Sequence, residues 1–262
     1  MSVEKTNEVG RVILDRFESV AQLTLSRKSA LNAMTWEMYQ QLEEHLINLE
    51  NDNSIRILVI RGDGDKALAA GTDISQFKGF TDKDGISYEH TIDRIINRLE
   101  AFPKPTIAAI HGYAVGGGLI IATACDLRYG TSNAKFGVPI SRTLGNCLSI
   151  HNYQRLAKAI GVMRTKELLY TARLISAEEA LSIGFLTDIF KEEDFFSKVL
   201  EIALKISKRA PLTIGATKEA FRRINRNHFE FDDMISKVYG SKDFAEGVAA
   251  YLEKRSPVWR GE

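Results

Sequence analysis

The segment GGGLIIATACD, residues 116–126, joins a glycine-rich turn to an all-apolar helix. A strand that flows through glycines into a helix leaves free backbone N–H groups at the helix N-terminus, where aligned peptide dipoles place partial positive charge. Such a turn can hold an anion, or an oxygen that becomes anionic during a reaction. The spacing matches neither GxGxxG nor GxxxxGKS, so it does not indicate a dinucleotide site or a P-loop. Tight packing of a helix against a strand is the alternative explanation for the three glycines.

A second turn of the same kind comes earlier in the chain. ALAAGTDISQF, residues 67–77, places small residues and Gly71 just before a short helix that Asp73 is expected to cap. Two small-residue turns that each follow a buried strand can direct two N–H groups at one point. Two such donors form an oxyanion hole, which suits a thioester carbonyl that becomes an enolate or a tetrahedral oxyanion.

The composition argues against several other functions. The 262 residues carry 35 Lys and Arg against 34 Asp and Glu, so the net charge of +1 gives no reason to expect a nucleic-acid partner. Cys125 and Cys147 form no CxxC pair and no Cys/His cluster, so no metal site is expected, and their apolar flanks predict buried, inert thiols. The N-terminus has no apolar signal segment, and no stretch is long enough to span a membrane, which predicts a cytoplasmic protein.

Strand and helix signals alternate over the first part of the chain. RVILDRF, VAQLTLS and SIRILVIRG are predicted strands, and PTIAAIHGYAVGGG is predicted as one further buried strand. Thr35 is expected to cap the helix TWEMYQQLEEHLINLEN, and a longer helix is expected from about residue 87 to 101. DLRYG and AKFG add two short strands, and only amphipathic helices are predicted after about Ser149. The pattern predicts an α/β core followed by a helical C-terminal region.

These segments resemble the crotonase (enoyl-CoA hydratase/isomerase) superfamily over nearly the whole chain. The matching stretches are SRKSALNAM at 26–34, ALAAGTDISQF at 67–77, KPTIAAIHGYAVGGG at 104–118, ACDLRYGTSNAKFG at 124–137, RTKELLYTARLISAEEALSIGFLTDIF at 164–190 and FAEGVAAYLEKRSPVW at 244–259. The resemblance implies a crotonase-like spiral of ββα turns over residues 1–195 and a helical C-terminal trimerisation region over residues 196–262. It also implies a homotrimer or a hexamer, and an acyl-CoA thioester substrate with no cofactor beyond its coenzyme A moiety.

The resemblance further assigns roles to individual residues. It makes the N–H groups of Thr72 and Gly117 the oxyanion-hole donors. The substrate-binding residues that it implies are Lys28, Ala30, Leu31, Ala70, Thr72, Asp73, Ile74, Gly117, Ile120 and Ile140. Lys28 is expected to meet a phosphate of coenzyme A, with a solvated loop lysine as the alternative.

The chain departs from the hydratases of this superfamily at two positions. Their two catalytic glutamates correspond to Ile120 and Ile140 here. Hydration of a 2-enoyl thioester needs one group to activate water and another to deliver a proton to the α-carbon, and isoleucine does neither. Standard hydratase activity is therefore not expected.

Side chains in the segment 136–152 are candidates for the missing chemistry. Histidine is the residue type most often used for acid/base catalysis, so for His151 an acid/base role is weighed against a surface or capping role. Arg142 is weighed as a partner for a substrate carboxylate, and either Ser141 or Arg142 as the occupant of the second glutamate's space. Cys147 is disfavoured as a nucleophile because no base stands at a fixed spacing from it.

The sequence therefore predicts an acyl-CoA lyase or isomerase that stabilises a thioester enolate in a backbone oxyanion hole. The first alternative is a decarboxylase or other lyase of a 2-carboxyacyl-CoA, since loss of CO2 forms the enolate directly and an apolar wall disfavours the charged carboxylate. The second alternative is a catalytically silent member that binds acyl-CoA.

Overall fold

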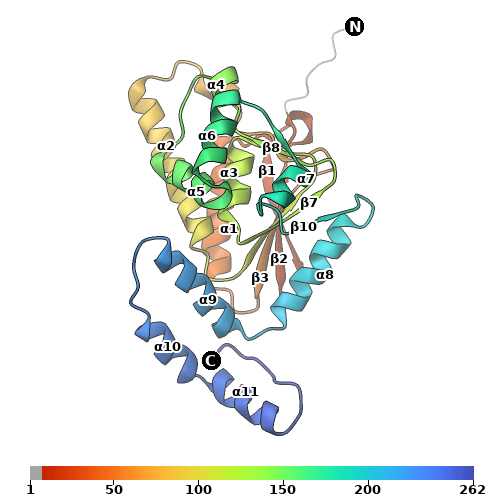
Figure 1. The fold of residues 1–262 in the computed structure, drawn as a ribbon. Helices are drawn as coiled ribbons and strands as arrows, with labels where there is room; N and C mark the ends of the chain where they lie inside the picture. The colour runs from red at the N-terminus through yellow and green to blue at the C-terminus, as the bar shows by residue number, and fades with distance from the viewer. Residues whose placement is uncertain (1–7) are drawn as a thin grey trace.

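A computed structural model describes residues 8–262 of the chain (Figure 1). The residues before these, where the sequence predicts no secretory signal, lie outside the described part. The larger of two sheets has the strand order β1-β2-β3-β5-β7-β10, and all neighbours are parallel except the antiparallel pair β1 and β2. Its strands are β1 Arg11–Phe17, β2 Val20–Ser26, β3 Ile57–Gly62, β5 Thr106–Ile110, β7 Leu127–Thr131 and β10 Asp188–Phe190.

The smaller sheet has the strand order β4-β6-β8-β9. Its strands are β4 Ala67–Ala69, β6 Tyr113–Val115, β8 Lys135–Gly137 and β9 Ile175–Ser176. The prediction of one strand in PTIAAIHGYAVGGG is wrong, because β5 pairs in the larger sheet and β6 in the smaller one. The chain crosses between the sheets at Gly112, which has φ +50° and where a Cβ would stand 1.9 Å from the carbonyl oxygen of Lys66. Only glycine fits this crossing.

Helices cover the sheets and make up most of the C-terminal part. The α-helices are α1 Trp36–Glu50, α2 Asp82–Glu100, α3 Gly117–Ala124, α4 Ile140–Thr143, α5 Ile150–Ile160, α6 Val162–Thr171, α7 Ala177–Ser182, α8 Phe195–Ser207, α9 Pro211–Ile224, α10 Asp232–Tyr239 and α11 Lys242–Leu252. Two short 3-10 helices, η1 Lys28–Ala30 and η2 Ile74–Phe77, lie in the loops that precede α1 and α2.

Local signals account for several helix ends. Thr35 caps α1 and Asp73 caps η2, both as predicted. Helix α2 begins earlier than the predicted position because Thr81 and Asp84 form a capping box. The prediction that only helices follow Ser149 is wrong, because β9 and β10 both lie there. Strands this short carry too little alternation of apolar and polar residues to be recognised from sequence.

Both faces of the larger sheet are covered. In β3, Leu58 and Ile60 belong to the core cluster that includes residues of α1, α2 and α3, whereas Ile57 and Val59 pack with residues of α8. Successive strand residues face opposite sides, so an apolar run such as ILVIRG fits a sheet buried on both faces. Helix α8, which begins at Phe195, therefore packs on the core. The predicted boundary between residues 195 and 196 stays a prediction.

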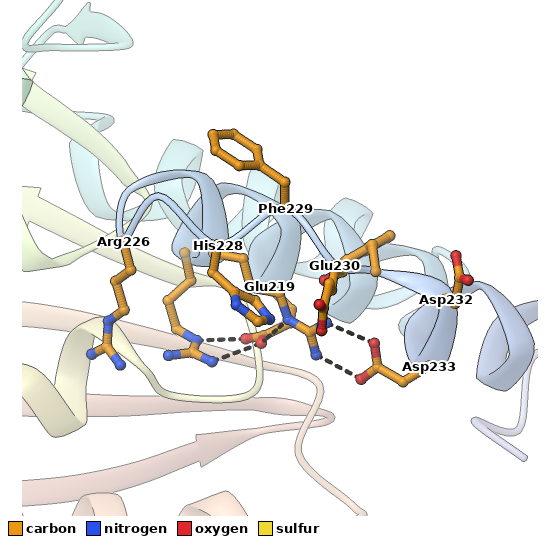
Figure 2. A pocket seen from close by; sticks show the side chains of 10 residues that line it. Glu219, Arg226, His228, Phe229, Glu230, Asp232 and Asp233 are labelled. Atoms are coloured by element: carbon orange, nitrogen blue, oxygen red, sulfur yellow. Dashed lines mark hydrogen bonds and ion pairs between the residues drawn. The ribbon is translucent and has the colours of Figure 1, made fainter.

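Helices α9, α10 and α11 extend from the core as a C-terminal arm (Figure 1). The arm carries exposed apolar side chains, among them Tyr251 and Leu252, which are 84% and 75% exposed. An ion-pair cluster joins α9 to α10: Arg223 binds Glu219 at 2.7 Å and Asp233 at 2.6 Å, beside a charged hollow (Figure 2). The predicted role of this region in trimerisation stays a prediction.

Candidate functional site

The two glycine turns identified in the sequence meet in the structure. Gly71 follows β4 with φ +107°, and Gly116 follows β6 with φ +54°. A Cβ on Gly116 would stand 3.5 Å from the Cα of Gly71, so the turns are in van der Waals contact. Positive φ is strained for residues with a side chain, which explains glycine at both positions.

The three consecutive glycines serve different purposes. Gly116 makes the turn, and Gly118 packs the start of α3 onto β4, since a Cβ there would stand 2.0 Å from the carbonyl oxygen of Ala69. Gly117 is crowded by hydroxyl groups: a Cβ would stand 2.5 Å from the Tyr39 oxygen and 3.2 Å from Thr72 Oγ1. Tight packing therefore explains Gly118, whereas Gly117 needs its small size to face a polar site.

The N–H groups of Thr72 and Gly117 donate no hydrogen bond to any of residues 8–262. Beside Thr72, the N–H of Met34 donates to the carbonyl of Gly71 at 2.8 Å. The carbonyl of Met34 in turn accepts from the N–H of Asp73 at 2.9 Å. Met34 thus pairs with the residues on either side of Thr72 and leaves the N–H of Thr72 unused. Gly117 is the first residue of α3 and has no earlier helical turn to bond to. Both amides are thus free to bind a ligand oxygen.

Thr72 and Gly117 both line a cavity of about 290 Å³. Most of its walls are apolar and come from α2, α3, α4 and the two turns. The lining residues are Tyr39, Ala70, Gly71, Thr72, Ile74, Phe77, Tyr88, Glu89, Ile92, Ile96, Val115, Gly116, Gly117, Ile120, Pro139, Ile140, Thr143, Leu144, Asn146, Leu148 and Asn152. Of these, only Glu89 carries a carboxyl group and none carries a cationic side chain. A mostly apolar cavity with a few converging polar groups is the usual form of a small-molecule site.

A chain of three hydroxyl groups lies beside the free amides. Thr72 Oγ1 is 3.0 Å from the Tyr39 hydroxyl and 3.0 Å from the Tyr88 hydroxyl. Burial raises the pKa of Tyr88 to about 12 and raises the pKa of Tyr39 well above its usual range. Trp36 and Phe77 pack edge-on against the Tyr88 ring, with centroids 5.1 and 4.9 Å away. Both tyrosines therefore stay neutral near pH 7, and packing holds the ring of Tyr88 in place.

Residues 15–262 match the model of the family described as Enoyl-CoA hydratase/isomerase. The chain belongs to this family. One relative is a short-chain-enoyl-CoA hydratase of Clostridium acetobutylicum, 32% identical over 95% of this chain and 97% of the relative. Another is an (E)-benzylidenesuccinyl-CoA hydratase of Thauera aromatica, 34% identical over 95% of this chain and 99% of the relative.

Solved structures of similar proteins have the same fold. An enoyl-CoA hydratase/carnithine racemase from Magnetospirillum magneticum superposes with a TM-score of 0.90 at 30% identity, over 96% of each chain. An enoyl-CoA hydratase from Bacillus anthracis gives a TM-score of 0.88 at 30% identity, over 96% of this chain and 100% of the other. The predicted crotonase superfamily and the α/β fold class are confirmed.

Several residues that the family resemblance assigns to the substrate lie together. Those that line the cavity are Ala70, Thr72, Ile74, Gly117, Ile120 and Ile140. The remaining four are close by in sequence or structure and do not line it. Leu31 accepts the N–H of Ala70 at 3.0 Å, which joins η1 and Ala30 to the first glycine turn. Lys28 pairs with Asp63 at 3.1 Å. The carboxylate of Asp73 pairs with Arg27 at 2.7 Å.

The candidate acid/base residues of the segment 136–152 lie elsewhere. Arg142 is exposed on α4 and does not line the cavity. His151 lines a different hollow, between α5 and α9, together with Asp126 and Lys218. The prediction that both thiols are buried is wrong. Cys125 is buried with its pKa raised to about 12, whereas Cys147 is exposed in the loop between α4 and α5.

Glu89, which the sequence analysis misses, is the titratable group that does reach the cavity. The pKa of its carboxyl group is raised to about 7. The main cause is burial; the charge of Asp93 adds to the increase, and the hydrogen bond from the N–H of Ser149 opposes it. One sequence signal was present: Glu89 shares a helical stripe with Ile92, Ile96 and the other buried residues of α2. A carboxylate in an apolar stripe indicates either a buried partner or a functional site.

Two further properties concern the part of the chain that the structure describes. No three His, Cys, Asp or Glu side chains gather there in an arrangement that could hold a metal ion. None of its helices combines the length and the apolar character needed to cross a membrane.

Proposed function

We propose that this chain processes an acyl-CoA thioester by stabilising an enolate, or a related oxyanion, of its acyl group. The observation that carries the proposal is the contact between the turns at Gly71 and Gly116, which brings Thr72 and Gly117 to one cavity. Neither of their N–H groups donates a hydrogen bond within residues 8–262. Hydrogen bonds to the thioester oxygen strengthen as that oxygen gains negative charge. They therefore lower the energy of the enolate more than that of the bound substrate.

The coenzyme A moiety would run outside the cavity along η1 and the first glycine turn. The hydrogen bond between Leu31 and Ala70 supports this path, since it places Ala30 and Lys28 beside the turn that precedes Thr72. The Lys28 side chain is 62% exposed, and its one ion pair within residues 8–262 is with the partly exposed Asp63, so its ammonium can turn toward a phosphate. The acyl chain would enter between Ile120, Ile140 and the apolar face of α2.

Hydration of a 2-enoyl thioester is not the reaction that we propose, although the relatives above are named hydratases. Ile120 and Ile140 both line the cavity. The family resemblance assigns the two hydratase glutamates to these positions. Water next to these side chains would meet no proton acceptor on that wall. Crotonyl-CoA hydration at a rate typical of the family would show that another group replaces both glutamates.

Decarboxylation of a 2-carboxyacyl-CoA is the second candidate, favoured by the apolar walls around Ile120 and Ile140. Such walls disfavour a bound carboxylate relative to CO2 and the enolate. Against it, no arginine, lysine or histidine of the described residues lines the cavity to hold the carboxylate before it leaves. CO2 release from methylmalonyl-CoA would favour this candidate over the first.

A panel of thioesters tests the proposal. The panel contains crotonyl-CoA, a 3-enoyl-CoA, butyryl-CoA and methylmalonyl-CoA, and products are identified by mass spectrometry. We expect turnover or α-proton exchange with at least one member, lowered by about 10²–10³ in Gly117→Pro, which deletes one donor. Binding of every thioester without turnover or exchange would instead support a catalytically silent acyl-CoA-binding protein.

A further inference from the structure

The cavity holds one carboxyl group, and it comes from a helix that contributes no residue to the glycine turns. Glu89 lies on α2, one and two helical turns before Ile92 and Ile96, and all three line the cavity. Ile120 and Ile140 line the same cavity. Glu89 is thus the only described lining side chain that can take up and release a proton near neutral pH.

Ser149, the N-cap of α5, holds this carboxylate in place. Its N–H donates to Glu89 Oε2 at 2.8 Å, and its hydroxyl donates to Asp93 Oδ1 at 2.5 Å. Within residues 8–262, the second oxygen of Glu89 accepts no hydrogen bond. One oxygen is therefore fixed and the other is free to meet a ligand.

The two carboxylates that Ser149 joins have different surroundings. Asp93 lies 3.9 Å from the guanidinium of Arg155, which is itself only 5% exposed. Glu89 has no Lys, Arg or His nitrogen within 4.0 Å among the described residues. Burial without a counter-charge explains the pKa of Glu89 near 7, where a carboxyl group exchanges protons readily.

The charge of Glu89 also acts on the groups beside the free amides. It raises the pKa of Tyr88 and of Tyr39, whose hydroxyls both contact Thr72 Oγ1. The carboxylate and the proposed oxyanion donors therefore share one electrostatic environment. An acyl group whose oxygen binds the amides of Thr72 and Gly117 would have its α-carbon within the same 290 Å³ cavity as Glu89.

We propose that Glu89 is the catalytic acid/base of this site and transfers the proton at the α-carbon of the acyl group. Its carboxylate takes a proton from C2, the C–H bond electrons form the C1–C2 double bond of the enolate, and the carbonyl electrons move to the thioester oxygen. The reverse step returns the proton from the carboxylic acid to carbon. This proposal rests on the proposed function above and adds the residue that moves the proton.

Exchange of α-hydrogen for deuterium tests the proposal. Butyryl-CoA is incubated in D2O with the full-length protein, and deuterium at C2 is measured by mass spectrometry. Glu89→Gln keeps the shape of the side chain and removes the base, so we expect exchange to slow by about 10²–10⁴. Glu44→Gln, the same change at an exposed glutamate of α1, should exchange at the wild-type rate. Wild-type exchange by Glu89→Gln would overturn the proposal.

Two further measurements separate catalysis from a structural effect. In Glu89→Ala, added formate should restore exchange in a saturable manner, because a small acid can occupy the vacated space. In the wild type, exchange should increase with pH through an apparent pKa near 7, and this dependence should be lost in Glu89→Gln. The charged and titratable groups that face Glu89 are Tyr39, Tyr88 and Asp93 with its partner Arg155. A folded Glu89→Ala variant without formate rescue would count against the proposal.

The outcomes also separate this proposal from the function on which it rests. Absence of exchange and turnover in the wild type, across the thioester panel, would overturn both. Exchange in the wild type that Gly117→Pro abolishes and Glu89→Gln leaves unchanged would retain the proposed function and remove Glu89 from it.

Discussion

Gly71 and Gly116 touch, although they follow strands β4 and β6 at well-separated points of the chain: a Cβ on Gly116 would stand 3.5 Å from the Cα of Gly71. Each glycine has a positive φ and immediately precedes one of the residues whose N–H we propose as an oxyanion donor. The contact sets the distance between the two donors. A side chain at either glycine would strain its turn and push the donors apart.

Substitution of Gly117 by alanine should lower activity although its N–H is retained. The new Cβ would stand 2.5 Å from the Tyr39 oxygen, so either this hydroxyl or the start of α3 must move. We expect a fall in kcat/KM of about 10²–10³, comparable to loss of one oxyanion donor. Gly85→Ala is the matched control, since a Cβ there meets no atom within 4 Å, and it should stabilise α2 by about 0.5–1 kcal/mol. If Gly117→Ala and Gly85→Ala had equal activity, Gly117 would not be part of the active site.

Removal of the Thr72 hydroxyl should affect stability more than catalysis. Thr72→Val retains the N–H and the shape but leaves the buried Tyr39 hydroxyl without its partner. We expect a loss of about 1–3 kcal/mol in the free energy of unfolding, measured by urea denaturation. Thr72→Ser keeps the hydroxyl and should lose much less. A larger effect of Thr72→Val on kcat than on stability would assign the hydroxyl a direct role in the chemistry.

The stability of the protein should depend on pH through Glu89. Its pKa is raised to about 7 from the usual 4.5, so between these values the folded state binds more protons than the unfolded state. The free energy of unfolding therefore falls as pH rises through this window. Glu89→Gln should remove this fall and gain on the order of 1–2 kcal/mol relative to wild type at pH 8, allowing for solvent screening. The gain should vanish below the usual pKa of 4.5. If Glu89→Gln and the wild type differed in free energy of unfolding by the same amount at both pH values, the raised pKa would not belong to Glu89.

The two cysteines should differ in reactivity. Cys147 is exposed, whereas Cys125 is buried with its pKa raised to about 12. Labelling of the native protein with N-ethylmaleimide should therefore modify Cys147 alone, and labelling in denaturant should modify both. Peptide mapping by mass spectrometry locates the label. Native labelling of Cys125 would show that α3 opens readily.

The C-terminal arm is proposed to bind further copies of the chain. Its exposed Tyr251 and Leu252 form an apolar surface that a solvated monomer would rarely carry. We expect light scattering to give a mass three or six times the 29.3 kDa of one chain, and Leu252→Lys to lower it. Ile86→Lys, at a 57% exposed apolar residue of α2, is the control and should leave the mass unchanged. A monomeric wild type would contradict the prediction.

Much of the architecture is a local property of the sequence. Thr35 and Asp73 cap the predicted helices, and the apolar runs of β2 and β3 indicate buried strands without reference to any other segment. The two glycine turns are also recognisable locally, because a positive φ requires glycine whatever surrounds it. These features and the family resemblance predict the fold class and the Thr72 and Gly117 pair.

Other features depend on contacts between distant segments. The crossing at Gly112 exists because the backbone of Lys66 lies against it, and β10 forms only because β7 offers an unpaired edge. The α8 helix belongs to the core because β3 presents a second apolar face. No local run of residues indicates these contacts, so the strand break and the packing of α8 cannot be recognised from the sequence alone.

The chemistry of the site also has a part that depends on local sequence and a part that depends on tertiary contacts. The sequence by itself determined which backbone turns can carry free amides, since that depends on glycine and on the start of a helix. Only the tertiary structure decided that Glu89 reaches the cavity and that Arg142 and His151 do not. The physical reason is that the surroundings and the pKa of a side chain follow from how its helix packs. The apolar stripe of α2 indicates that Glu89 is partly buried, but only the packed structure brings it to the N–H of Ser149 and to the cavity.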